Sequence, residues 1–94
     1  MNDTYEGLKD KNWLKTLYTL MRSLGFEHRY SKSYVAVYWH PKLECEFMVR
    51  ESNGEYLYGY WVGTEIRMDF YDFGMCFRAM LARIVEEKEK GNEG

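Results

Sequence analysis

The feature that most constrains the fold is a change in the spacing of apolar residues along the chain. Between residues 34 and 62 side chains of two kinds alternate, which is the period of a β-strand. On either side of this stretch apolar residues recur every three or four positions, as in an amphipathic helix. Pro41 and the segment Ser52-Asn53-Gly54 divide the alternating stretch into three strands. Helices packed on an antiparallel sheet, an α+β fold, would bury the apolar faces of such a chain.

The first helical stretch is expected to begin at Asn12, although Asp3 or Thr4 could start an earlier turn. It is expected to end at Gly25, with Phe26 making the apolar contact that accompanies a glycine C-cap. Its apolar stripe consists of Leu14, Leu17, Tyr18, Met21 and Leu24. The second helix is expected to start after Asp69 or Asp72 and to end near Glu89. Its stripe consists of Phe73, Phe77, Met80, Leu81 and Ile84.

Residues 64–70 also alternate, so a fourth strand fits there. We therefore predict a two-layer α+β fold in the order helix, antiparallel β-meander of three strands (four if 64–70 is a strand), helix. The predicted domain spans residues 1–90 as one unit, and residues 91–94 are expected to form a flexible tail.

The register of the sheet decides which side chains face the helices. A three-residue loop around Gly54 would pair Val49 with Leu57, whereas a two-residue Asn53-Gly54 loop would pair Val49 with Tyr58. We prefer the longer loop because it keeps apolar residues together on one face. The same requirement, that apolar residues share one face, aligns Val35 of the first strand with Val49 of the second. The predicted core face then consists of Val35, Val37, Trp39, Cys45, Phe47, Val49, Leu57, Gly59 and Trp61.

The other face of the sheet is then predicted to be rich in tyrosine. The chain contains 9 Tyr, 5 Phe and 3 Trp, and a domain this small leaves some rings near its surface. Exposed patches of Tyr, Met and Arg usually mark contact sites, although cross-strand aromatic pairs also stabilise sheets without any partner. The predicted partner-binding residues are Tyr34, Tyr38, Glu44, Glu46, Met48, Arg50, Tyr56, Tyr58 and Tyr60.

The sequence contains no Gly-rich phosphate loop, nucleophile elbow or paired-cysteine zinc pattern. His40 could join Glu44 and Glu46 on the tyrosine-rich face, but this set matches no known ligand spacing, so we expect structural roles. Cys45 and Cys76 are expected to be small buried hydrophobic residues. We therefore expect no enzyme activity, no cofactor and no bound metal.

Nucleic acid is a less favoured partner. With 13 basic and 15 acidic residues the formal charge is −2, which argues against a general polyanion binder. The element order is similar to that of double-stranded RNA-binding domains, but the position of their basic cluster here reads Asp69-Phe70-Tyr71-Asp72-Phe73-Gly74. The alternative is base stacking on the sheet tyrosines, with phosphates held by basic residues of the first helix.

The preferred hypothesis is a small binding protein that acts through protein–protein contacts of the sheet face. Its partner would have a basic surface, which Glu44, Glu46, Glu51 and Glu55 would attract. In size and character, as a small, acidic and aromatic-rich chain, the protein resembles phage-encoded inhibitors of host defence, including anti-CRISPR proteins. This resemblance implies an inhibitor of a host nucleic-acid-handling or defence complex. A homodimeric interaction module is a further alternative.

No run of about 18 apolar residues is present, so no membrane span is expected. The start of the chain is polar and acidic, unlike a signal peptide. The expected compartment is the cytoplasm, which is the host cytoplasm if the protein is phage-encoded.

Overall fold

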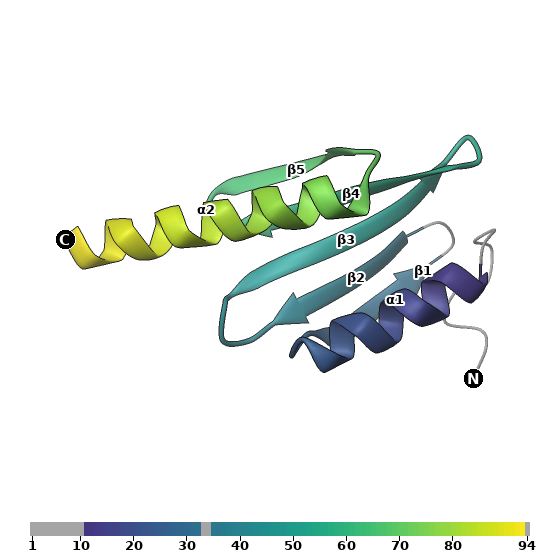
Figure 1. Ribbon diagram of the computed structural model, residues 1–94, viewed down its shortest axis with the longest axis horizontal. Coiled ribbons are helices and arrows are strands. Elements are labelled where there is room, and N and C mark those ends of the chain that lie inside the picture. Colours follow the sequence, from purple (N-terminus) through teal and green to yellow (C-terminus); the bar gives the residue numbers. More distant parts are fainter. Residues whose placement is uncertain (1–10, 33–34, 94) are drawn as a thin grey trace.

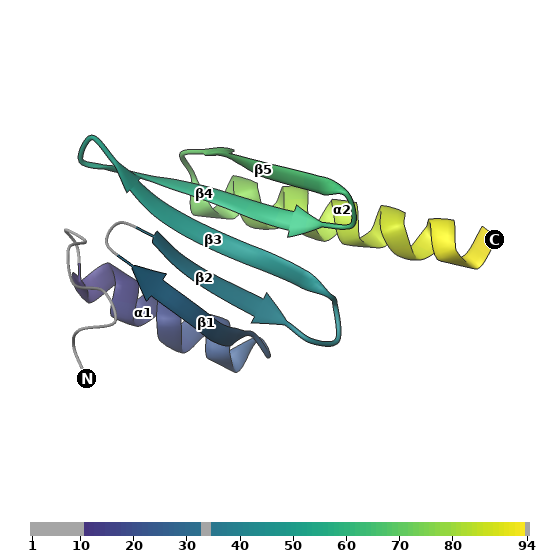
Figure 2. The ribbon, with the colours of Figure 1, turned by 180° about the vertical axis from the view of Figure 1, so that it is seen from behind.

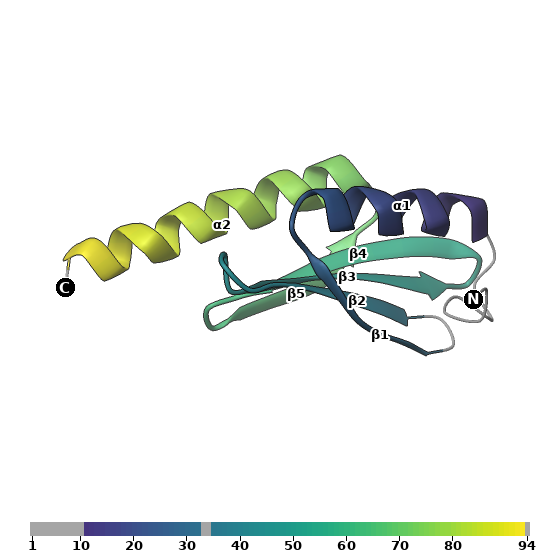
Figure 3. The ribbon, with the colours of Figure 1, turned by 90° about the horizontal axis from the view of Figure 1, so that it is seen from below.

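The computed structural model describes residues 11–32 and 35–93. Its elements are α1 (Lys11–Ser23), β1 (Glu27–Lys32), β2 (Val35–His40), β3 (Cys45–Ser52), β4 (Glu55–Val62), β5 (Glu65–Phe70) and α2 (Phe73–Glu93). The strands form one antiparallel sheet in chain order, and both helices lie on the same side of it (Figures 1 and 3). The predicted helix–meander–helix α+β fold is confirmed, with five strands rather than three or four.

Contacts within a few residues fix the C-terminal end of α1 and the N-terminal start of α2. Gly25 adopts φ 98°, and the backbone N–H of Phe26 donates to the carbonyl of Met21 at 2.9 Å, which completes a Schellman C-cap. Asp72 is the N-cap of α2, because its Oδ2 accepts a hydrogen bond from the backbone N–H of Met75 at 2.9 Å. The predicted helix end at Gly25 is therefore confirmed, and of the two predicted starts for α2 the structure uses Asp72. The expectation that α1 begins at Asn12 is wrong, because Lys11 is already helical. Asp3 and Thr4 lie outside the described residues.

The C-terminal helix is longer than expected. It continues past Glu89 to Glu93, and its last turns project beyond the end of the sheet (Figures 1 and 3). Residues 91–93 of the predicted tail are thus helical, while Gly94 lies outside the described residues. Two leucines of the predicted helical stripes, Leu24 and Leu81, are exposed rather than buried.

Strand β1 has no counterpart in the sequence prediction. Its sequence Glu27-His28-Arg29-Tyr30-Ser31-Lys32 contains no apolar alternation, because an edge strand pairs with a single neighbour and is less enclosed than an inner strand. Its pairing with β2 is interrupted by a bulge between His28 and Tyr30. Half-buried His28 packs edge-on to Tyr18 and at a tilt to Tyr38, and this burial lowers its pKa from the usual value.

The predicted register is wrong for both hairpins. Ser52 pairs with Glu55 across a two-residue loop, and Asn53 and Gly54 both have positive φ, of 53° and 82°, as a type I′ turn requires. The loop between β2 and β3 contains Glu44 at φ 56°, so Val35 pairs with Arg50 instead of Val49. Each change moves one strand by one residue and turns its side chains over to the opposite face.

The face covered by the helices is consequently built around tyrosines. Tyr38, Phe47 and Tyr60 form one row across the sheet, beside the pair Val49 and Tyr58. The three tyrosines are at most 6% exposed. Of the nine residues predicted for the core face, Cys45, Phe47 and Val49 on β3 do face the helices. The predicted positions of Val35, Val37 and Trp39 on β2 and of Leu57, Gly59 and Trp61 on β4 are wrong, because these residues face the other side of the sheet.

The buried tyrosines keep polar partners within the core. The Trp13 indole donates to the Tyr58 hydroxyl at 3.0 Å, and the Tyr60 hydroxyl donates to a Glu65 carboxylate oxygen at 3.1 Å. Burial of a phenol is unfavourable unless its hydroxyl has such a partner. Cys45 and Cys76 are free and buried, as predicted.

Candidate functional site

The sheet face opposite the helices, here called the open face, is the candidate site. Figure 2 shows it without a covering element among those that the structure describes. The pairing register places three rows of side chains on this face. These rows are Val35–Arg50–Leu57, Val37–Met48–Gly59 and Trp39–Glu46–Trp61–Ile66.

The last of these rows is the most exposed apolar part of the open face. Trp61 is 46% exposed and its neighbour Ile66 is 64% exposed. The Trp61 indole Nε1 donates to the carbonyl of Gly63 at 3.0 Å, which restrains the ring. On β2, the half-buried Trp39 ring has the Arg29 guanidinium over it, 5.1 Å from the ring centroid. Two indoles are therefore presented on strands that flank β3, with the Glu46 carboxylate between them.

The centre of the open face is tightly packed. Met68 lies across Gly59, because a Cβ at this glycine would come within 2.5 Å of the Met68 sulfur. Val37, although on the open face, is only 3% exposed. Gly59 thus allows Met68 of β5 to approach the β4 backbone closely.

Several predicted partner-binding residues are not on the open face. Tyr38, Tyr58 and Tyr60 are buried beneath the helices, and Tyr56 is half-buried and packs against the same core. The expectation that they form an exposed tyrosine surface is wrong. Tyr34 lies outside the described residues.

The remaining predicted residues do lie on or near this surface. Glu46, Met48 and Arg50 are on the open face, and Glu44 is exposed in the β2–β3 turn. Their predicted role in partner binding stays a prediction. The residues that the sequence analysis missed are Trp39, Trp61, Ile66, Met68, Leu57 and Val35. The Asn53-Gly54 pair was the available signal, because this dipeptide favours a two-residue turn that places Trp61 outward.

His40 does not gather with Glu44 and Glu46 as the sequence suggested. Its ring lies on the helix side, where Nδ1 accepts a hydrogen bond from the backbone N–H of Leu43 at 3.1 Å. Nε2 therefore carries the proton and donates to the Leu24 carbonyl, also at 3.1 Å. His40 thus connects the β2–β3 turn to the end of α1.

Within residues 11–32 and 35–93, no group of three His, Cys, Asp or Glu residues is arranged to hold a metal ion. In the same ranges, no helix is long and apolar enough to cross a membrane. The sequence matches no protein-family model, and neither a curated protein nor a solved structure is significantly similar to it. The geometry of the open face is therefore the basis for any functional proposal.

Proposed function

We propose that this chain is a small protein-binding module that docks through its open face. The observation that carries the proposal is the row of half-buried Trp39 and exposed Trp61 and Ile66 on an uncovered sheet. Exposed apolar patches on small proteins mark interaction sites, and Trp, Met and Arg are enriched in the energetic centres of interfaces. The sheet presents these side chains on a rigid framework, which lowers the entropic cost of binding.

The proposal extends to the inhibitory role inferred from the size and character of the sequence. A rigid binding face with no catalytic group assigned to it suits a protein that acts by covering a functional surface of its partner. Glu46, which lies between Trp39 and Trp61 in the sheet, and the nearby Glu44 support a partner with a basic surface. A cytoplasmic setting is proposed because Cys45 and Cys76 are free thiols.

The test is affinity capture from a nuclease-treated cell lysate, followed by titration of the purified partner. We expect Trp61→Gln and Ile66→Gln each to weaken binding by about thirtyfold or more, since hot-spot side chains contribute about 2 kcal/mol or more. Met75→Gln is the matched control, because Met75 is 60% exposed but lies on α2. Equal binding by all three variants would exclude the open face as the interface.

Two other outcomes would change the assignment. A doubled solution mass that Ile66→Gln reduces to that of a monomer would show that the open face joins two copies of this chain. Single-stranded nucleic acid remains a second candidate, because Trp39 with its Arg29 and the neighbouring Trp61 offer stacking surfaces on an open sheet. Fluorescence anisotropy of a labelled oligonucleotide would then give an affinity that falls steeply with salt.

A further inference from the structure

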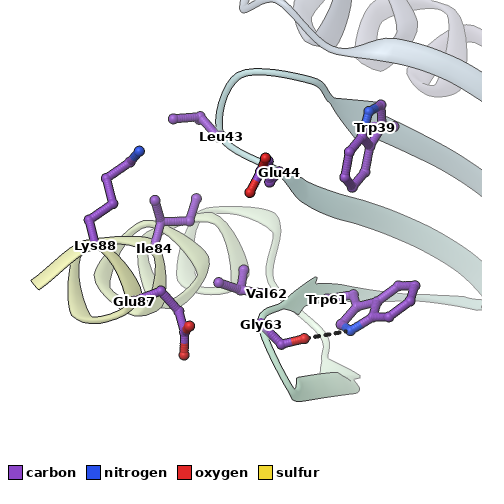
Figure 4. A pocket seen from close by; sticks show the side chains of 9 residues that line it. All are labelled: Trp39, Leu43, Glu44, Trp61, Val62, Gly63, Ile84, Glu87 and Lys88. Atoms are coloured by element: carbon purple, nitrogen blue, oxygen red, sulfur yellow. Dashed lines mark hydrogen bonds between the residues drawn. The ribbon is translucent and has the colours of Figure 1, made fainter. Parts of the chain in front are cut away.

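A pocket of about 360 Å³ opens beside Trp39 and Trp61, between the β2–β3 turn and α2. Figure 4 shows Trp39 and Trp61 at one side of it and Ile84 and Lys88 at the other, with Glu44 between them. Val62 and Leu43 complete the apolar lining. The volume lies in the range of small-ligand pockets, and the lining joins the open face to the C-terminal half of α2.

The two indoles are held in place before any ligand arrives. The Trp61 indole is restrained by its hydrogen bond to the Gly63 carbonyl. The Trp39 ring already attracts a cation from the chain itself, since the Arg29 guanidinium lies over it. Indole faces are the best aromatic partners for ammonium and guanidinium groups, so this side of the pocket is suited to a positive charge.

The carboxylates of the pocket divide into two kinds. Glu87 is committed to the fold, because its Oε2 pairs with Arg83 at 2.6 Å and its carboxylate packs against Gly63. By contrast, no ion pair joins Glu44 or Glu46 to a basic side chain among the described residues. Glu44 lines the pocket and Glu46 lies between the two indoles in the sheet.

No ion pair joins the lysine of the lining, Lys88, to these carboxylates among the described residues. Lys88 lies on the side of the pocket opposite Trp39 and Trp61 (Figure 4). The indole side of the pocket therefore combines the Trp61 ring, the Trp39 ring with Arg29 over it, and the Glu44 carboxylate, while Leu43, Val62 and Ile84 offer apolar contact. An anion would meet Glu44, and a purely apolar group would leave its carboxylate without compensation.

We propose that this pocket binds one organic cation carried on an apolar stem, with an ammonium or guanidinium group between the indoles and Glu44. The source that fits the proposed function, on which this part rests, is a Lys or Arg side chain of the partner protein. A free alkylammonium ion has the same chemistry. The pocket would thus supply the anchor that selects a basic partner for the open face.

The experiment follows the three indole N–H signals in the ¹⁵N–¹H spectrum of the intact chain. Trp13 is an internal control, because its indole donates to Tyr58 rather than lining the pocket. The probes are the blocked peptides Gly-Arg-Gly and Gly-Lys-Gly, their neutral analogues with citrulline and norleucine, and butylammonium with butanol. We expect the cationic probes to move the signals of Trp39 and Trp61 but not that of Trp13, with dissociation constants of about 1 mM.

The neutral analogues should bind at least about fivefold more weakly, the ratio expected if the positive charge contributes about 1 kcal/mol. Peptide binding without butylammonium binding would assign the pocket to a protein side chain, whereas butylammonium binding without peptide binding would assign it to free cations. Equal shifts with charged and neutral probes, or no shift at all, would overturn the proposal.

Variants distinguish a loss of cation binding in the pocket from unfolding of the chain and from a failure of the proposed protein-binding function. Glu44→Gln should weaken cation binding severalfold, whereas Glu55→Gln, in the hairpin at the other end of β4, should not. Trp61→Phe should weaken it further, and unchanged Trp13 and methyl signals would show that the variant is folded. Cation binding with no protein partner would contradict the proposed function alone, while a partner whose binding is unaffected by Glu44→Gln would contradict the anchor role alone.

Discussion

The indole N–H of Trp13 donates to the hydroxyl oxygen of Tyr58 at 3.0 Å, and this hydrogen bond joins the first turns of α1 to the inner strand β4. The Tyr58 ring also packs edge-on against Phe73 and lies tilted to Phe47. Tyr58 therefore connects both helices to the sheet, which explains why β4 presents its tyrosines to the core.

Substitutions at Tyr58 should separate the contribution of its hydrogen bond to stability from the contribution of its buried ring. We expect Tyr58→Phe to lower the free energy of unfolding by about 1 kcal/mol, because one partly buried hydrogen bond is lost. Tyr58→Ala should cost about 3–5 kcal/mol, because it also removes the ring from the core. Urea denaturation measures both values. A fully stable Tyr58→Ala variant would place this ring outside the core and support the register with the longer loop.

Gly59 should be intolerant of any side chain. A Cβ here would overlap the backbone carbonyl oxygen of Arg67 and approach the Met68 sulfur. Because a backbone atom blocks the space, we expect Gly59→Ala to cost about 2 kcal/mol or more and to disturb the β4–β5 pairing. Gly74→Ala is the control, since its nearest atom is a side-chain oxygen of Asp72 at 3.3 Å. Thermal unfolding should show a large loss only for Gly59→Ala.

Arg83 holds α2 against the edge of the sheet. Its guanidinium pairs with Glu65 of β5 at 3.0 Å and with Glu87 one helical turn away at 2.6 Å, and its side chain is only 14% exposed. We expect Arg83→Met to lower stability by about 1–2 kcal/mol, more than an exposed pair would contribute. Exposed Arg78 provides the comparison, and Arg78→Met should have little effect. The difference in the free energy of unfolding between the Arg83→Met and Arg78→Met variants should become smaller as salt is added. A difference that persists unchanged at high salt would show that packing, not charge, is responsible.

The two thiols should make stability fall at alkaline pH. Burial raises the pKa of Cys45 to about 11, with a further contribution from the Glu46 carboxylate, and burial raises the pKa of Cys76 to about 12. Unfolded thiols release their protons near pH 9, so above this pH the folded state binds more protons than the unfolded state. Their contribution to stability is complete below pH 9 and is lost as the pH rises toward the folded values.

Denaturation curves between pH 8 and 10.5 measure this loss. Each thiol contributes at most about 1.4 kcal/mol per pH unit, so the slope should decrease in the double variant Cys45→Ala, Cys76→Ala. At neutral pH both thiols should resist alkylation until the chain unfolds. Rapid labelling of the folded protein would show that the thiols are accessible.

The parts of the fold that were predictable are those with local causes. Gly25 ends α1 and Asp72 begins α2 through contacts within a few residues. Pro41 interrupts the alternating pattern whatever the tertiary structure. The register was not predictable by the criterion of a uniform apolar face, because that criterion treats valine, leucine and tryptophan as better core residues than tyrosine. Tyr58 and Tyr60 are buried because Trp13 and Glu65 supply partners for their hydroxyls, and these contacts exist only in the tertiary structure.

The candidate site was predicted in position but not in composition. The uncovered sheet face followed from the expectation that both helices cover the same, apolar face of the sheet. Its content depended on the parity of β2 and β4, and a one-residue error exchanged tyrosines for Trp39 and Trp61. Residues of β3 kept their predicted faces, so Glu46, Met48 and Arg50 were placed correctly.

Glu44 combines a strained backbone with an exposed carboxylate. A substitution here should therefore change both the stability of the chain and the affinity of the pocket for cations. At φ 56° a glycine is favoured over a residue with a side chain, so we expect Glu44→Gly to raise the free energy of unfolding by about 1 kcal/mol. The same change removes the carboxylate from the pocket and should weaken the binding of cationic probes severalfold. Asn53→Gly is the control, because Asn53 also has positive φ but lies in the distant β3–β4 turn. A Glu44→Gly variant that gains stability and keeps its full cation affinity would show that this carboxylate has no part in the pocket.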